Sequence, residues 1–129
     1  METIVDYDDI VSYIKANYNT GVTTLPKMVN QQVGQPQKGG IVLFIEMLSI
    51  DYPVATTGVN STDISATMWT MTLYAASQTD ADAAKEELRR IINAKSISSG
   101  WWHVDQIVPF TRSKWSRYFF TCSENKLLI

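Results

Sequence analysis

The chain has 129 residues, a formal charge of −2 from 11 Lys or Arg and 13 Asp or Glu, and 45% hydrophobic residues. This length fits one domain, and this apolar content can build a core without disulfides or metals. Collagen, coiled coil and disorder are excluded. The near-neutral balance argues against a broad basic face that would hold phosphates, so we expect no sequence-specific nucleic-acid binding.

Membrane insertion and secretion are not expected. The longest apolar run, Ile41–Ile45, is far shorter than the about 20 residues that cross a bilayer. The segment Met1–Asp6 lacks the positive start and long apolar stretch of a signal peptide. The single Cys122 cannot form an internal disulfide, which favours a reducing intracellular setting.

The first predicted element is an amphipathic helix over Tyr7–Tyr18, capped by Asp6. It should stop near Gly21, which can adopt the left-handed conformation common at helix ends. The apolar residues recur at helical spacing, at Ile10, Val11, Ile14 and Tyr18. A long Pro/Gly-rich loop over residues 22–40 follows, with a candidate short strand at Lys27–Asn30.

Two long strands come next. β-Branched and aromatic residues predict one over Ile41–Tyr52 and another over Thr62–Ser77, joined by a polar hairpin tip at Pro53–Ser61. In the second strand, alternate positions carry the larger apolar side chains, which should face the core. These are Trp69, Met71, Leu73 and Ala75.

A second helix is predicted over Asp80–Ala94, capped by Ser77 or Thr79, because an apolar stripe recurs at helical spacing. Two further strands, Trp101–Thr111 and Trp115–Ser123, should pair as a hairpin. Pro109 cannot donate a ladder hydrogen bond, so it points to an edge or a bulge.

The order of these elements is α-β-β-α-β-β, so the predicted fold is α+β: an antiparallel sheet of about four strands packed against two helices. A single domain should span residues 1–129, with the long loop at residues 22–40.

The residues do not predict catalytic, cofactor or metal chemistry. One His and one Cys leave too few ligands for zinc. His103 and Cys122 are interpreted as packed or surface residues of strands rather than as a general base and a nucleophile. The pair Glu124 and Lys126 has a spacing used by some metal-dependent nucleases, but the sequence printed ends three residues later, without a following helix. We therefore expect no catalytic, cofactor-binding or metal-binding residues.

The adjacent residues Trp101 and Trp102 carry more information, because consecutive strand residues point to opposite faces. Both indoles can be buried only if both faces of the sheet are covered, by a neighbouring subunit or by the long loop. The basic and aromatic stretch Arg112–Phe120 could stack bases over a positive strip. A hairpin that divides its side chains between core and solvent explains it more simply.

In order, the first helix, the loop leading into Ile41–Ile45, the strand ending Trp69–Ser77 and the helix Asp80–Ala94 resemble the tail-terminator (tail-completion) proteins of long-tailed bacteriophages and related viruses. The strand passes into the helix through a Tyr-Ala-x-Ser pattern, and the helix ends in Leu-Arg-Arg-Ile-Ile. Arg117 and Tyr118 in the last strand also fit.

The resemblance implies a structural virion protein rather than an enzyme. Such a protein is made in the host cytoplasm and assembles as a ring, typically a homohexamer, at the head-proximal end of the tail tube. There it stops tail growth and joins the tail to the head connector. Its partners would be copies of itself, the tail-tube protein and the head-completion or connector protein. Head-closure and other neck or minor tail proteins remain open within this assignment.

A ring made of identical contacts needs surface that pairs sheet edges or covers apolar faces. The candidate subunit or partner contacts are aromatic and basic residues of the last hairpin and polar residues of the two loops: Trp101, Trp102, Phe110, Arg112, Lys114, Trp115, Thr57, Asn60 and Gln35. The alternative function is a small cellular α+β module that binds a ligand or regulates a partner.

Overall fold

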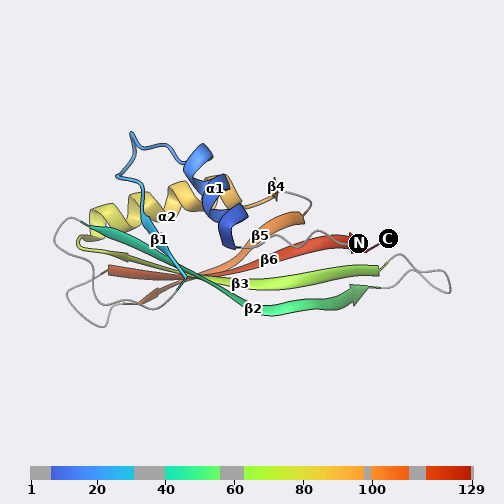
Figure 1. Cartoon of the computed structure of the whole chain (residues 1–129). Coiled ribbons are helices and arrows are strands. Elements are labelled where there is room, and N and C mark those ends of the chain that lie inside the picture. The colour runs from blue at the N-terminus through green and yellow to red at the C-terminus, as the bar shows by residue number, and fades with distance from the viewer. Residues whose placement is uncertain (1–6, 31–39, 56–62, 98–99, 111–115, 129) are drawn as a thin grey trace.

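The computed structural model describes residues 7–30, 40–55, 63–97, 100–110 and 116–128. It contains two helices and six strands in one sheet within this part of the chain (Figure 1). The elements are α1 (Tyr7–Asn17), β1 (Lys27–Val29), β2 (Ile41–Ala55), β3 (Asp63–Ala75), α2 (Gln78–Ile92), β4 (Lys95–Ile97), β5 (Gly100–Phe110) and β6 (Ser116–Leu128).

The strand order in the sheet is β1-β2-β3-β6-β5-β4. This corrects the expected antiparallel sheet of about four strands: the sheet has six strands and is mixed, because β1 runs parallel to β2. The two additional strands, β1 and β4, have three residues each and lie at opposite edges. β1 coincides with the candidate short strand at Lys27–Asn30, but its parallel pairing with β2 depends on a distant partner and was not predicted. β4 was missed because a segment this short shows no readable alternation of apolar and polar residues.

Both helices begin and end close to their predicted positions. The side chain of Ser77 caps α2 by accepting a hydrogen bond from the Asp80 N–H at 3.1 Å, which confirms one of the two predicted caps. The prediction of a left-handed Gly21 was wrong, because its φ lies outside the left-handed region. The described non-glycine residue with positive φ is Ala94, at 55°, where the chain turns from α2 into β4.

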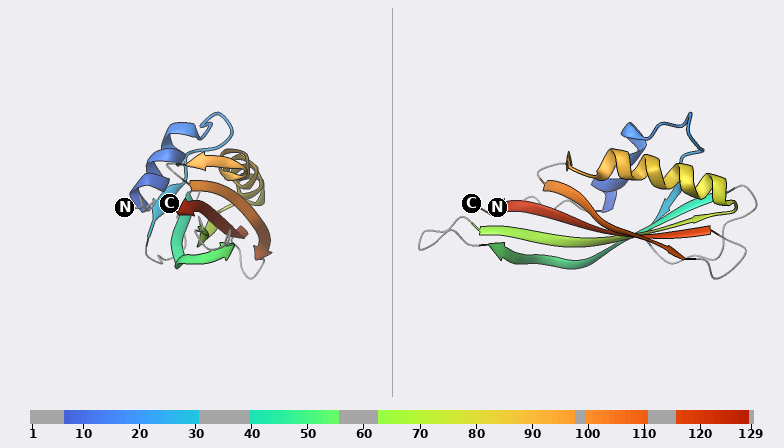
Figure 2. Two further views of the ribbon diagram at one scale, coloured as in Figure 1. Left: turned by 90° about the vertical axis from the view of Figure 1, so that its right-hand side faces the viewer. Right: turned by 180° about the vertical axis from the view of Figure 1, so that it is seen from behind.

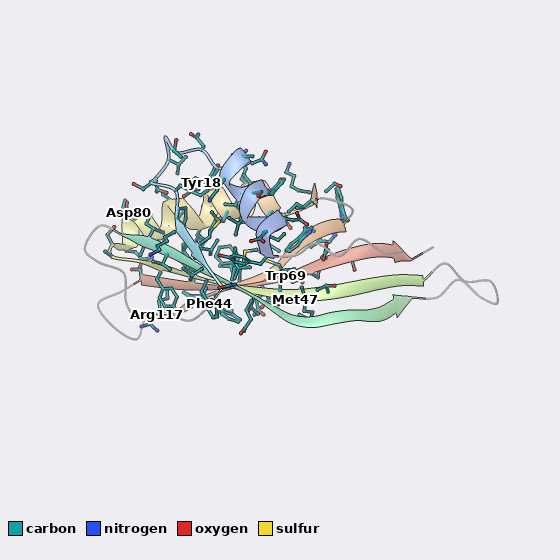
Figure 3. The ribbon with its side chains drawn as sticks, viewed as in Figure 1. Tyr18, Phe44, Met47, Trp69, Asp80 and Arg117 are labelled. Carbon is teal, nitrogen blue, oxygen red and sulfur yellow. The ribbon has the colours of Figure 1, made fainter. Side chains whose placement is uncertain are left out.

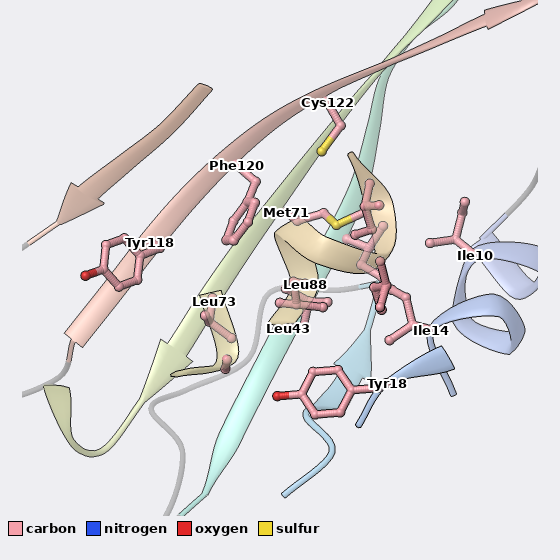
Figure 4. Packing of buried hydrophobic residues seen from close by; sticks show 14 of the residues in the cluster. Ile10, Ile14, Tyr18, Leu43, Met71, Leu73, Leu88, Tyr118, Phe120 and Cys122 are labelled. Atoms are coloured by element: carbon pink, nitrogen blue, oxygen red, sulfur yellow. The ribbon is translucent and has the colours of Figure 1, made fainter. Parts of the chain in front are cut away.

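The core lies between the helices and one face of the sheet (Figure 4). Alternate residues of β3 and β6 point into it, among them Met71 and Phe120, and both have no exposed surface. The helices contribute Ile14 and Leu88, which are also fully buried. The predicted inward set of β3 is confirmed: Trp69, Met71, Leu73 and Ala75 are all buried.

The sheet is longer than the layer of helices that covers it. In Figure 1 both helices lie above one half of the sheet, while β2, β3 and β6 run on past them. The sheet is also strongly twisted and curled, as the end-on view in Figure 2 shows. In this extension β3 and β6 pair without a register shift, with Ile64 beside Leu127. The pairing of β2 with β3 reaches Ala55, beside Ile64, but its register shifts between Met47 and Ser49, between Ser49 and Tyr52 and between Pro53 and Ala55.

The strand β5 carries the irregularity expected near Pro109. Its register with β6 shifts between Val104 and Gln106, which places a bulge at Asp105. Among the described residues β5 pairs with β4 only at Gly100–Trp102, so Pro109 lies on a stretch where β6 is the single strand neighbour. A proline is tolerated there because an edge needs no donor on its outer side.

Candidate subunit interface

The sheet face opposite the helices carries a row of apolar and aromatic residues. The register places Phe44 beside Thr72, Thr72 beside Phe119, and Phe119 beside Val108, so four strands contribute to one row. All four side chains are partly exposed. No described helix covers this face (Figure 2).

The neighbouring row on the same face contains a cation–π pair. The Arg117 guanidinium lies over the Tyr74 ring, 5.2 Å from its centroid. Figure 3 shows the Phe44 and Arg117 side chains on the side of the sheet away from the helices. This face is therefore a mixed aromatic and basic surface, of the kind enriched at protein interfaces.

Each edge of the sheet is only partly paired within the described residues. β1 pairs with Val42–Phe44 of β2, which leaves the section of β2 from Glu46 to Ala55 with β3 as its single neighbour. At the other edge, β4 pairs with Gly100–Trp102 of β5 and leaves the section from His103 to Phe110 with β6 alone. Unpaired sections of this length can accept another strand.

Two adjoining surface depressions, of about 290 and 220 Å³, lie where α2 ends beside the edge of β5. They share Arg89. Their linings combine the end of the helix with the bulged part of the strand: Glu86, Arg89, Arg90 and Asn93 in the larger, and Arg89, Val104, Asp105, Gln106 and Ile107 in the smaller. The N–H of Val104 on this edge donates to the Asn93 side chain at 3.0 Å.

The structure separates the two adjacent tryptophans that we predicted as contact residues. Trp101 is 46% exposed and packs edge-on against His103, with ring centroids 6.0 Å apart. Trp102 is fully buried in the core, 5.5 Å from the Trp69 ring. Its indole therefore has no accessible surface to offer a neighbouring subunit, whereas that of Trp101 does.

The other predicted contact residues are not placed in detail. Phe110 ends β5 beside Arg117, but only its backbone position is described. The remaining predictions lie outside the described residues: Arg112, Lys114, Trp115, Thr57, Asn60 and Gln35.

The acidic residue of the Glu124 and Lys126 pair, whose nuclease-like spacing we did not interpret as a catalytic site, lies in the core. Glu124 has no exposed surface, and its Oε1 accepts a hydrogen bond from the Trp69 indole N–H at 3.5 Å. A Cβ added to Gly100 would lie 2.4 Å from its Oε2, so the β5 backbone passes directly over this carboxylate. A carboxylate enclosed in this way cannot reach a phosphate or a hydrated metal.

The other two chemistry-bearing residues lie apart from any cluster of ligands. Cys122 is fully buried, and burial raises the pKa of its thiol to about 12, which leaves almost no thiolate near neutral pH. His103 is partly exposed beside Trp101. Among the described residues no group of three or more His, Cys, Asp and Glu converges as metal ligands would.

Sequence reasoning missed the most regular surface of the molecule, the row from Phe44 to Val108. The inward set predicted for β3 implies that the residues between its members, among them Thr72 and Tyr74, face the other way, but their partners on the other strands depend on the register. Neither described helix has the length and apolar character needed to span a membrane. Searches of protein-family models and of curated proteins gave no match to this chain.

Proposed function

We propose that this chain is a structural virion protein that resembles the tail terminators of long-tailed phages. Copies assemble as a ring at the head-proximal end of the tail tube, where the ring stops tube growth and contacts the head connector. The protein acts by presenting surface to copies of itself and to the tail-tube and connector proteins, without catalysing a reaction. It is made in the host cytoplasm and resides in the virion.

The observation that supports this proposal most is the sheet extension beyond the helices. There β3 pairs with β6 without a register shift and with β2 through several irregularities, yet no described helix of the chain covers either face (Figure 1). A sheet is ordinarily covered on at least one face. Assembly with other subunits would provide that cover and would account for an exposed tryptophan where the extension begins.

Trp101 marks this position. Across the sheet, Trp101 of β5 pairs with Asn125 of β6, Asn125 pairs with Ala66 of β3, and Ala66 pairs with Tyr52 of β2. Beyond this row of four residues, β2, β3 and β6 continue as the extension. Large aromatic side chains of this kind often carry much of the binding energy of an interface.

Oligomeric state tests the proposal. Light scattering after size-exclusion chromatography, with electron microscopy of the peak, should find rings of the chain alone or on assembled phage tail tubes. Trp101→Ser should weaken assembly at least tenfold, because an interface aromatic commonly contributes 2 kcal/mol or more, about thirtyfold in affinity. A chain that stays monomeric at high concentration and does not bind tail tubes contradicts the proposal.

The chain offers a matched control for that variant. Among the residues whose side chains the structure describes, Val22 is the other large apolar one with high exposure, 44% against 46% for Trp101, and it lies in the loop after α1, away from the extension. Val22→Ser should leave assembly unchanged. Equal loss of assembly in both variants would mean that general surface hydrophobicity, rather than this position, drives association.

A further inference from the structure

The two incompletely paired edges of the sheet lie at different levels along the strands. Two residues are level when the strand pairing connects them in one row across the sheet. In this sense His103 of β5 is level with Ser49 of β2, and Phe110 of β5 is level with Val42 of β2. The open section of β5 is therefore level with residues 42–49 of β2, whereas the open section of β2 is Glu46–Ala55.

We propose that the open section of β2 in one copy pairs with the open section of β5 in the next copy, antiparallel, so that one sheet runs through successive subunits. This inference names the subunit contact of the ring and so rests on the proposed function. The directions of the strands agree with it. β2 runs toward the extension and β5 runs away from it, so two copies in the same orientation bring these edges together antiparallel.

The short strands β1 and β4 fix the offset between the copies. Each blocks one end of its edge, at opposite ends of the sheet. Counted on β3, which pairs with β6 without a register shift, the open section of β5 spans Met68–Tyr74 and that of β2 spans Ile64–Thr70. For the open sections to overlap fully, one copy must shift along the strands by about four residues of β3, roughly 14 Å at about 3.4 Å per residue. Measured across the strands, each copy contributes β2, β3, β6 and β5 between one contact and the next. The distance from β2 of one copy to β2 of the next is therefore four strand spacings, roughly 19 Å.

These two lengths set the inclination of the strands in a closed ring. Copies related by a rotation axis lie at one height, so a shift along the strands requires the strands to tilt relative to the axis. A shift of roughly 14 Å over a width of roughly 19 Å corresponds to a tilt of about 35°, at the lower end of the range of about 35–45° seen in closed β-barrels. The offset imposed by β1 and β4 is thus compatible with closure.

Charge supports the same alignment. The open section of β2 carries two acidic residues, Glu46 and Asp51, and no basic residue. Full overlap places Tyr52, and with it the neighbouring Asp51 in the irregular part of β2, opposite the part of β5 around Gln106. Arg89 lines the depression beside that part of β5. Arg89 is 57% exposed and its contact to Glu86 is long, at 3.8 Å, so it can turn toward a new carboxylate at little cost.

The acidic residue already in this depression has a partner of its own. Asp105 accepts a hydrogen bond from the Ser123 hydroxyl at 3.2 Å. Arg90, on the other side of Arg89, is held by Glu87 at 2.8 Å through its Nε. Arg89 is therefore the cation of this region best placed to receive Asp51 of a second copy.

Cysteine cross-linking tests the contact directly. Asp51→Cys and Gln106→Cys are made as separate variants, mixed, and treated with a short bismaleimide. We expect a covalent dimer in the mixture but in neither variant alone, and a ladder of larger species when both substitutions are in one chain. Ser12→Cys, at an exposed position on α1, mixed with Gln106→Cys is the control and should give no dimer. The buried Cys122 should not contribute.

The outcomes separate this contact from the proposed function. Rings or oligomers without a cross-link above the control overturn the edge pairing and leave the proposed function standing. A chain that never assembles, alone or on tail tubes, overturns both. Unchanged circular dichroism and melting temperature of each variant establish that it is folded.

Charge reversal provides a second measurement on the same contact. Arg89→Glu should raise the concentration needed for half-assembly by roughly threefold or more, and adding Asp51→Lys to that variant should restore it. Lys15→Glu, an exposed reversal on α1, should have no such effect. Failure of Asp51→Lys to restore assembly, with both variants folded, overturns the alignment of Asp51 with Arg89.

Discussion

The Glu87 carboxylate on α2 accepts a hydrogen bond from the backbone N–H of Asn19, 2.7 Å away, and so ties the segment that follows α1 to the second helix. The Arg90 side chain completes the connection: its Nε donates to Glu87 at 2.8 Å, and its Nη2 donates to the Asn17 carbonyl at 3.3 Å. Glu87 is only 5% exposed. This buried carboxylate is one of the links between the two helices, beside the hydrogen bond that the Tyr13 hydroxyl of α1 donates to the Ile91 carbonyl of α2.

Replacing Glu87 by Gln should lower the free energy of unfolding by about 1.5–3 kcal/mol, the range for hydrogen bonds to a charged group. Hydrogen bonding from Arg90, followed by the Asn19 N–H, holds the pKa of Glu87 below its ordinary 4.5. The charged form therefore contributes stability above the unfolded-state pKa, and this contribution is lost as pH falls through the lower folded-state pKa. Thermal melts from pH 7 to pH 3 check both effects.

The stability difference between wild type and Glu87→Gln should shrink below about pH 4.5, where the wild-type carboxylate begins to protonate in the unfolded chain. Glu86→Gln is the control. Its side chain is 60% exposed, so its effect should stay within about 0.5 kcal/mol. A pH-independent difference for Glu87→Gln would show that lost packing, rather than lost charge, causes the destabilisation.

The close approach of β5 to Glu124 predicts a strict requirement for glycine at position 100. A Cβ there would lie 2.4 Å from Oε2 and 2.5 Å from Cγ of Glu124, which is fully buried and has little room to move. Gly100→Ala should destabilise the fold by about 1–3 kcal/mol, as overpacking does. Urea unfolding measures it. Gly21→Ala, where the nearest atom is 3.1 Å away on an exposed Asn19 side chain, should cost less.

Periodicity predicted the helices and the strands β2, β3 and β5 to within a few residues, but it ended the last strand at Ser123, whereas β6 runs to Leu128. It also did not predict how the sheet is completed. The helical spacing of Ile10 and Ile14 and the alternation around Trp69 each reflect one buried face, which a sequence reveals directly. The strands β1 and β4 have three residues each, and their pairing depends on distant partners. These two strands, however, set where the sheet edges are open.

The candidate interface was predictable in part, for a similar reason. Two consecutive tryptophans in a strand must point to opposite faces, and this correctly indicated one indole outside the helix-covered core. The sequence does not say which of the two is buried, because that depends on the register of β5 with β6 and on the bulge at Asp105. The row from Phe44 to Val108 likewise appears only when four strands are aligned.

The turn between α2 and β4 contains a strained residue whose replacement should stabilise the protein. Ala94 has a φ of 55°, a left-handed conformation that costs an L-residue roughly 1–2 kcal/mol. Ala94→Gly removes the clash of Cβ, offset in part by the greater freedom of glycine in the unfolded chain, and should gain about 0.5–1 kcal/mol. Chemical denaturation measures the gain. Ala83→Gly, inside α2, should lose about 1 kcal/mol instead.

Cys122 should be unreactive in the folded protein and become reactive when the protein unfolds. Its thiol is fully buried, and burial raises its pKa to about 12, so both access and thiolate formation are suppressed. With a disulfide reagent at pH 8, the native protein should react far more slowly than the Ser12→Cys variant, whose added thiol is exposed. In guanidinium chloride the wild type should release one equivalent of thiol product per chain. Rapid native reaction would mean that β6 opens readily from the helix layer, because that layer encloses the thiol in the folded state.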